Sequence, residues 1–227
     1  MKYLLSISLL LSFTAPAHAQ ALIIDSTRFI TGINQGIIVQ FIIPTTDKGI
    51  LLVGQDFGNP GGIIPYFFDT SYNGNVSVIK IDSNHQISWI KVYGGSLADQ
   101  GVSACQTIDG GYAVLATTSS NDGDVTGFHG GNDFWLLRLD ASGNLLWEQC
   151  YGGPAGEQAT SIANTPDNGF ILMGTTNGAG GEVPLHYGGY FTLDWLVMKT
   201  DTHGNLQWAN TVSTSISGMI FVINWYG

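Results

Sequence analysis

A block of about sixty residues that occurs three times limits the folds open to this chain more than any other feature. One part of the block is an apolar segment that ends in Asp, found at residues 75–82, 133–140 and 194–201. A tryptophan follows seven residues later in each copy: Trp89, Trp147 and Trp208. A second part, Asp-x-Gly followed by apolar residues, begins at Asp47, Asp109 and Asp167. Because both parts recur in step, we expect the chain to fold as three similar units.

Each copy of the repeat predicts two β-hairpins. In the third copy, residues 159–164 turn at 167–169 and return over 170–176, and residues 195–200 turn at 203–205 and return through Trp208. The Asp-Gly and Asn-Gly pairs in these turns supply the positive φ that a tight hairpin requires. No segment shows helical periodicity. The sequence therefore predicts an all-β fold of four-stranded antiparallel blades, like those of a β-propeller, rather than a β-solenoid, whose repeats are usually shorter and parallel.

The predicted organisation is a signal peptide over 1–19, a lead-in over 20–35, repeats over 36–95, 96–153 and 154–212, and a divergent tail over 213–227. Closed propellers use about 4–8 blades, so three repeats predict an incomplete, propeller-like array. Two explanations stay open: a truncated copy of a longer protein, or an open array that closes by pairing with another chain. Open blade edges also predict self-association.

The first twenty residues have the pattern of an export signal. Lys2 supplies a positive charge, residues 3–13 form an apolar run, and Ala17-His18-Ala19 is a small-x-small cleavage site. The apolar run is shorter than the roughly 20 residues that a membrane-spanning helix needs. We therefore expect a secreted protein, extracellular or on the cell surface, with the periplasm as the alternative and with no transmembrane segment.

The charge balance excludes two classes of partner. The chain has 7 Lys and Arg against 17 Asp and Glu, a formal net charge of −10. Phosphate contacts need clustered basic side chains, so the sequence predicts neither a nucleic-acid binder nor a protein of anionic membrane surfaces. Its partner is expected to be a protein or a glycan.

Residues that recur in every copy are expected to serve the fold. The tryptophans are predicted to pack between adjacent blades, with a ligand platform as the alternative. A basic residue also recurs at one repeat position, as Lys80, Arg138 and Lys199. Each lies two residues before a carboxylate and so shares a strand face with it: Asp82, Asp140 and Asp201. The predicted role is a structural ion pair or hydrogen bond repeated in every blade.

Two further groups of residues carry open interpretations. Asp122, Asp124 and Asp133 lie in a glycine-rich stretch whose oxygens suit Ca²⁺, although the pattern favours turn capping. Cys105 and Cys150 are either a disulfide, which an oxidising compartment would permit, or two small buried hydrophobes. The chain has no G-x-S-x-G, H-E-x-x-H or P-loop pattern, so it predicts no catalytic residue and no cofactor other than calcium.

The recurring residues resemble a known group. The pattern D-x-W-L, then G-N-x-x-W, Y-G-G and T-x-D-G-G-Y is similar to that of secreted bacterial proteins with propeller-like, bulb-type lectin-like or delta-60-like repeats. Many of these proteins look like type IX secretion substrates. The resemblance extends from about residue 36 to Trp208 and implies the fold and secretion. The mannose-binding pattern of bulb lectins, Q-x-D-x-N-x-V-x-Y, does not occur in the chain.

Two hypotheses for the function follow. The first is a non-enzymatic interaction or scaffold module that contacts glycans or proteins, and it is motivated by the signal pattern together with the blade repeats. The second is a fragment of a propeller enzyme, a hydrolase or a quinoprotein-like protein, whose active site lies in missing blades. Because function resides in sites rather than in folds, the absence of a catalytic pattern makes the sequence favour the first.

Overall fold

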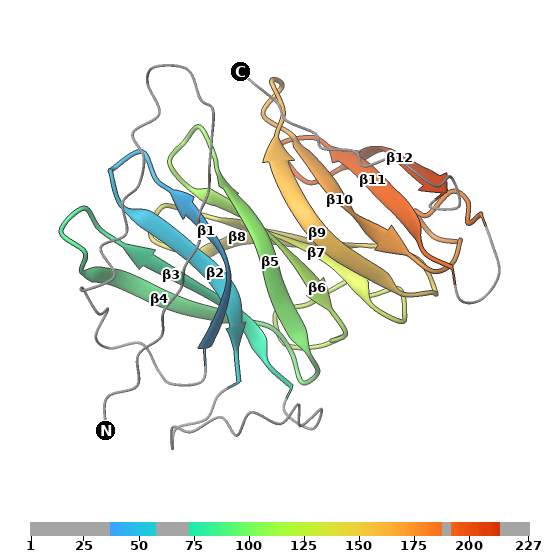
Figure 1. Ribbon diagram of the computed structural model, residues 1–227, viewed down its shortest axis with the longest axis horizontal. Coiled ribbons are helices and arrows are strands. Elements are labelled where there is room, and N and C mark those ends of the chain that lie inside the picture. Colours follow the sequence, from blue (N-terminus) through green and yellow to red (C-terminus); the bar gives the residue numbers. More distant parts are fainter. Residues whose placement is uncertain (1–36, 58–72, 188–191, 214–227) are drawn as a thin grey trace.

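The computed structural model describes residues 37–57, 73–187 and 192–213, which form three four-stranded antiparallel sheets (Figure 1). Blade 1 contains β1 (Ile37–Pro44), β2 (Ile50–Asp56), β3 (Asn75–Ile81) and β4 (Ile87–Tyr93). Blade 2 contains β5 (Asp99–Gln106), β6 (Tyr112–Thr118), β7 (Asp133–Leu139) and β8 (Leu145–Tyr151). Blade 3 contains β9 (Glu157–Asn164), β10 (Phe170–Thr176), β11 (Asp194–Thr200) and β12 (Leu206–Ser213). The chain is all-β, with one blade in each repeat.

Strands that follow each other in sequence are neighbours in every sheet, so each blade is a simple meander. Predicted features in residues 1–36 and 214–227, including the signal peptide and most of the divergent tail, lie outside the described residues. In the part that the structure describes, no helix is long and apolar enough to cross a membrane.

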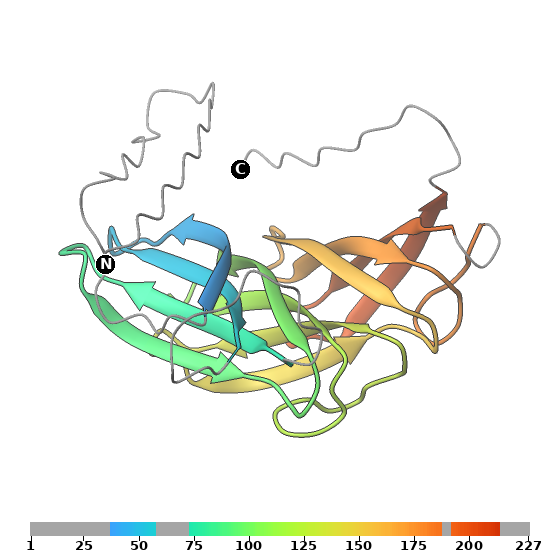
Figure 2. The ribbon, with the colours of Figure 1, turned by 60° about the horizontal axis from the view of Figure 1, so that its bottom comes forward.

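The blades pack face to face in chain order. The first strand of each blade makes the main contact with the blade before it: β5 lies against β1, β2 and β3, and β9 lies against β5, β6 and β7. Figures 1 and 2 show the three sheets side by side, with blade 2 between the other two. Apolar side chains fill both junctions, including Leu51 and Trp135 in the first and Phe134 and Phe170 in the second.

The position of blade 2 explains the sequence of its middle strands. Every residue of β6 and β7 is buried, because another blade covers each face of the sheet. A strand covered on both faces carries a run of apolar residues rather than an alternating pattern, as YAVLA in β6 and FWLL in β7 do. In β10 and β11 of blade 3, by contrast, buried residues alternate with partly buried ones over most of the strand.

The meander gives each blade two different ends. Short turns join the first two and the last two strands of every blade at one end, which we call the turn end. The connections between the second and third strands, and the links between blades, lie at the opposite end, which we call the loop end. One residue in each β3–β4, β7–β8 and β11–β12 turn has a positive φ: His85 (63°), Gly143 (77°) and Gly204 (84°). Glycine adopts this conformation without steric cost, whereas histidine does not.

Candidate functional site

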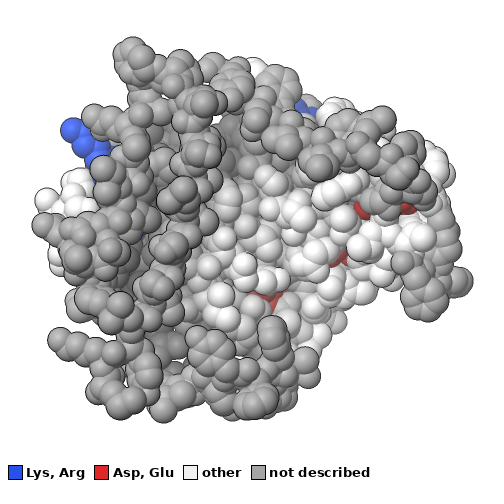
Figure 3. Space-filling model, in the orientation of Figure 1, with Lys and Arg blue, Asp and Glu red and all other residues white. Residues whose placement is uncertain are grey.

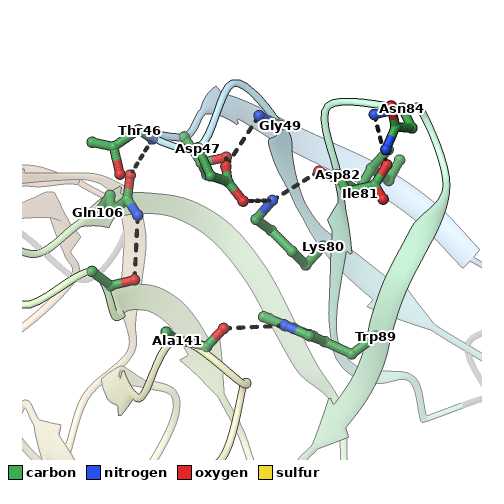
Figure 4. A network of polar contacts seen from close by, with 12 residues as sticks. Thr46, Asp47, Gly49, Lys80, Ile81, Asp82, Asn84, Trp89, Gln106 and Ala141 are labelled. Carbon is green, nitrogen blue, oxygen red and sulfur yellow. Dashed lines mark hydrogen bonds and ion pairs between the residues drawn. The ribbon is translucent and has the colours of Figure 1, made fainter.

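The repeated tryptophans lie where one blade meets the next. Trp89 packs on the β7–β8 turn of blade 2, where a Cβ added to Gly143 would come within 2.9 Å of the indole ring. The indole N–H donates a hydrogen bond to the carbonyl oxygen of Ala141 at 3.2 Å (Figure 4). The ring also meets Tyr112 edge-on, with centroids 6.0 Å apart. Tyr93 donates its hydroxyl to the carbonyl oxygen of Gly143, and burial raises the pKa of this phenol, so it stays a donor.

The same contact, which we call the blade latch, recurs between blades 2 and 3. Trp147 lies over Gly204, where an added Cβ would be 2.8 Å from the ring, and Tyr151 donates to the carbonyl oxygen of Gly204 at 2.5 Å. Trp147 also packs beside Phe170, with centroids 6.5 Å apart. Both tryptophans occupy the blade junctions where the repeat pattern places them. Trp208, the third copy, is 44% exposed, and no further blade follows it in the described part of the chain.

The repeated basic residues form ion pairs, but with different carboxylates from those predicted. Lys80 and Lys199 each place Nζ 2.8 Å from an aspartate oxygen, and Arg138 places Nη2 2.5 Å from one. The partners lie in the turn between the first two strands of the same blade: Asp47, Asp109 and Asp167. The prediction that the partners are Asp82, Asp140 and Asp201 is therefore wrong.

The end of the strand accounts for the difference. Each basic residue is the next to last of its strand, so the aspartate two residues later already lies in the turn. The nitrogen of Lys80 also reaches the carbonyl oxygen of Ile81, at 2.8 Å (Figure 4). Asp82 instead accepts hydrogen bonds from the backbone N–H groups of Asn84 and Gln86 in its own turn. Asp140 and Asp201 cap the equivalent turns of blades 2 and 3 in the same way.

The hydrogen bond to Lys80, followed by that to Thr45, holds the pKa of Asp47 at about 2. A lowered carboxylate pKa adds stability above the ordinary value of about 3.9, and that stability is lost as the pH falls through the folded-state value. Because the Asp47 side chain is 56% exposed, solvent screens the pair and its contribution to stability is small.

The three aspartates considered for calcium have separate partners. Asp122 accepts the backbone N–H of Ser96 at 2.7 Å, and Asp124 accepts that of Gly94 at 3.1 Å. Asp133 is buried and contacts His129. Among the described residues, no group of three or more His, Cys, Asp or Glu side chains is placed to hold a metal ion. The glycine-rich stretch 119–132 is thus tied to the link between blades 1 and 2 by its acidic side chains.

Both cysteines are free thiols. Cys105 is on β5 and Cys150 is on β8, the two edge strands of one four-stranded sheet. Three strand spacings of about 4.8 Å separate these edges, whereas the two Cα atoms of a disulfide lie within about 7 Å. Burial raises the pKa of Cys105 to about 12 and also raises that of Cys150, which disfavours the thiolate form of both side chains.

A group of four titratable side chains lies at the loop end, where blade 2 meets blade 3. We call it the loop-end cluster, and it consists of His129, Asp133, Glu157 and Glu182. His129 Nδ1 lies 2.8 Å from the carboxylate of Asp133, and its Nε2 lies 3.7 Å from Glu182. Glu182 also accepts the backbone N–H of Gly152 at 2.9 Å. His129 and Glu182 are 30% and 29% exposed, so the cluster has one buried side and one that reaches solvent.

Gly152 brings the two buried carboxylates of the cluster together. A Cβ at this position would lie 2.4 Å from an oxygen of Glu157 and 2.7 Å from Oδ1 of Asp133, an oxygen that has no hydrogen-bond partner. Glu157 accepts hydrogen bonds from the hydroxyl of Thr176 at 2.7 Å and the backbone N–H of Gly153 at 2.8 Å. Both carboxylates are at most 1% exposed. They therefore hold the blade junction and cannot touch a substrate.

An equivalent arrangement joins blades 1 and 2, with one carboxylate fewer. Asp99 occupies the position of Glu157 and accepts the backbone N–H of Gly95 and the hydroxyl of Thr118. Asn75 takes the place of Asp133, and the two side chains flank Gly94 as their counterparts flank Gly152. Burial raises the pKa values of Asp99, Asp133 and Glu157.

These raised pKa values make stability depend on pH. The folded chain binds a proton at Glu157 more tightly than the unfolded chain, whose glutamates titrate near 4.3. The favourable contribution is therefore complete below that value and is lost as the pH rises through the folded-state pKa. Glu157→Gln should flatten the fall in unfolding free energy as the pH rises above about 4.3, measured by urea denaturation at several pH values.

Asp140→Asn is the matched control for this substitution, because it changes the charge equally at a turn where hydrogen bonds from Asn144 lower the carboxylate pKa. It should leave the slope above about pH 5 as in the parent chain. Equal slopes for the parent and for Glu157→Gln would show that the buried glutamate does not bind a proton in this range.

Sequence patterns overlook the loop-end cluster because its members are far apart in the chain and only partly repeated. One signal does exist: Asp99 and Glu157 follow Tyr-Gly-Gly at the same spacing in two copies. His129 and Glu182 come from two long connections of different length. Glu182 is the counterpart of Asp124, because each lies between glycine and valine and accepts the backbone N–H of the glycine that follows a junction tyrosine. No family model matches this sequence, and comparison with curated proteins found none that is similar to it.

Proposed function

We propose that this chain is a secreted, non-enzymatic binding module and that the loop end of its blades holds a positively charged partner protein. The observation that carries the proposal is the separation of charge along the strands. Acidic side chains lie at both ends of the blades, whereas the basic side chains of the described residues all lie in the turns at the turn end or contact them. An acidic surface with no basic counterpart attracts cationic partners and raises their rate of association.

The distribution of basic residues is specific. Lys80, Arg138 and Lys199 are buried and paired with turn aspartates. Lys48 lies in the β1–β2 turn, and Lys91 donates to Asn144 beside the β7–β8 turn. In Figure 3 the basic atoms in view lie along the upper margin, and the acidic atoms in view lie below them. The basic side chains are thus either occupied by the fold or distant from the loop end.

The loop end has the composition of a surface that binds a protein. Its described acidic residues include three that reach solvent, Asp122, Asp124 and Glu182, and four that are buried, Asp99, Asp133, Glu157 and Asp194. Large apolar side chains are also exposed there, with Leu97 at 44%, Leu185 at 53% and Tyr187 at 47%. Protein interfaces combine aromatic and apolar contacts with a polar rim, and charge fixes the choice of partner. The export pattern in residues 1–19 supports placement of this module outside the cytoplasm.

Binding to poly-L-lysine, a cationic probe, tests the proposal. We expect the full chain to bind it with an affinity that falls as salt rises. The triple variant Asp122→Asn, Asp124→Asn, Glu182→Gln keeps the hydrogen-bond acceptors of these side chains but removes three charges. It should bind about tenfold more weakly, as isothermal titration calorimetry can measure.

The matched control is Asp82→Asn, Asp140→Asn, Asp201→Asn, which removes three charges at the turn end and leaves side chains that still cap turns. This control should bind within about twofold of the parent chain. Equal weakening by both triple variants would mean that net charge alone drives binding. Salt-independent binding to a neutral polysaccharide, unchanged by the loop-end triple variant, would replace this proposal with glycan recognition.

A further inference from the structure

The side of blade 3 that faces away from blade 2 is built like a blade junction. We call it the outer face, and its residues are Ile171, Met173, Trp195, Val197, Trp208 and Val212. In the repeat these positions correspond to Ala113, Leu115, Phe134, Leu136, Trp147 and Tyr151 of blade 2. All the blade 2 residues except Trp147 are at most 1% exposed, because blade 3 covers them. The outer face thus repeats an interface that the chain forms twice.

The exposure of the outer face differs from that of its counterparts. Ile171, Met173, Trp195 and Val197 are only partly buried, and Trp208 and Val212 are 44% and 36% exposed. The alignment of strands is nevertheless the same. Trp208 pairs with Lys199 as Trp89 pairs with Lys80 and Trp147 with Arg138. Blade 3 therefore presents the tryptophan of a blade latch in its usual position.

The latch also defines what its occupant must contain. Both observed latches place the indole ring directly on a buried glycine of a turn, and a Cβ there would lie 2.8–2.9 Å from the ring. Real Cβ atoms do not approach ring carbons so closely, so any other residue would displace the tryptophan. A blade that covers Trp208 in this way needs glycine at the turn position of Gly143 and Gly204.

A second copy of this chain does not meet that requirement. Its blades 2 and 3 have the glycine, but the face that each would need is already covered by the blade before it in its own chain. Blade 1 has His85 at the turn position, with φ 63°, so a side chain stands where the indole ring would lie. The face of blade 1 that points away from blade 2 would have to cover the outer face. It contains Leu52, Ile79 and Ile81, which are at most 5% exposed, so it is not available for docking.

We propose that the outer face of blade 3 docks a further β-blade of the same repeat type, with glycine at the latch turn. Such a blade would lay its first strand across β9, β10 and β11, as β9 lies across β5, β6 and β7. Its turn glycine would receive the ring of Trp208. Val212 in place of Tyr93 and Tyr151 removes the hydroxyl part of the latch, so this junction is the weaker one.

An extended chain provides the test, in which residues 1–213 are followed by a second copy of residues 154–213. The added blade has the latch glycine and no other place to pack. We expect Trp208→Ala, nearly neutral in the full chain, to lower the folding equilibrium constant of the extended chain at least about tenfold. A matched extended chain with Gly204→Val in the added copy alone should lose this sensitivity. Urea denaturation measures both.

Each other outcome contradicts the proposal. An added blade that stays unfolded, with Trp208→Ala still neutral, would show that the outer face does not accept a blade. Light scattering that finds a dimer of the full chain, lost on Trp208→Ala, would make a second copy the occupant. If residues 214–227 are removed and Trp208 becomes newly accessible to acrylamide, that segment is the occupant.

Discussion

Trp89→Ala is expected to lower the free energy of unfolding by about 3 kcal/mol, whereas Trp208→Ala should change it by less than about 0.5 kcal/mol. The two residues occupy the same position in their repeats, but Trp89 packs on Gly143 and Tyr112 of the next blade. Trp208 has no such neighbour among the described residues and is 44% exposed. Urea denaturation followed by far-ultraviolet circular dichroism gives both values.

The comparison separates two explanations of the repeated tryptophan. If the residue stabilises its own blade, both substitutions will have similar effects, because the strand environment of each is the same. If it joins blades, only the residue with a following blade will matter. Surface substitutions usually change the free energy of unfolding by about 0.5 kcal/mol or less. If Trp208→Ala lowers it by about 2 kcal/mol or more, the result will contradict the blade latch.

The second large effect is expected at the buried cation of blade 2. Arg138 is 7% exposed and donates to the carbonyl oxygens of Leu139 and Tyr112 as well as to Asp109. Arg138→Ala removes all three contacts and leaves a gap over Gly111, where the guanidinium lies close to the backbone. We expect a loss of about 3 kcal/mol in unfolding free energy, measured by urea denaturation.

Lys91→Ala is the control for this loss of charge. Lys91 makes one hydrogen bond, to Asn144 at 3.3 Å, on an exposed surface. Its removal should cost less than about 1 kcal/mol. If Arg138→Ala costs no more than Lys91→Ala, then the repeated cation is a surface charge and does not hold the β5–β6 turn to the end of β7.

The repeat allows most of the fold to be predicted from the sequence. Asp-x-Gly turns and apolar strands recur in step, and each repeat forms one four-stranded sheet. The ion pairs are harder to predict, because alternation along a strand places Lys80 beside Asp82 only if the strand continues through Asp82. The strand ends at Ile81, and Lys80 pairs with Asp47 of the neighbouring turn instead. Which turn lies beside Lys80 depends on how the strands pair, and a single sequence does not reveal that pairing.

The candidate sites are harder to predict from the sequence than the fold. The loop-end cluster joins His129 and Glu182 from two long connections, and only the packing of blades 2 and 3 brings them together. The presence of two cysteines suggests a disulfide. Cys105 and Cys150 lie on opposite edge strands of one sheet, however, and are too far apart to form one. The repeat pattern does single out His85, because the other two copies have glycine at this position. The reason for the glycine is visible only in the structure, where a tryptophan of the preceding blade packs on it.

The blade latch can be tested most directly by the solvent exposure of its three tryptophans in one sample. The chain contains six tryptophans, which 5-fluorotryptophan labels together and single Trp→Phe variants assign. We expect the ¹⁹F resonance of Trp208 to shift clearly between H₂O and D₂O, and those of Trp89 and Trp147 to shift far less, because blades cover them. Equal shifts for Trp147 and Trp208 would contradict the arrangement of blades described above.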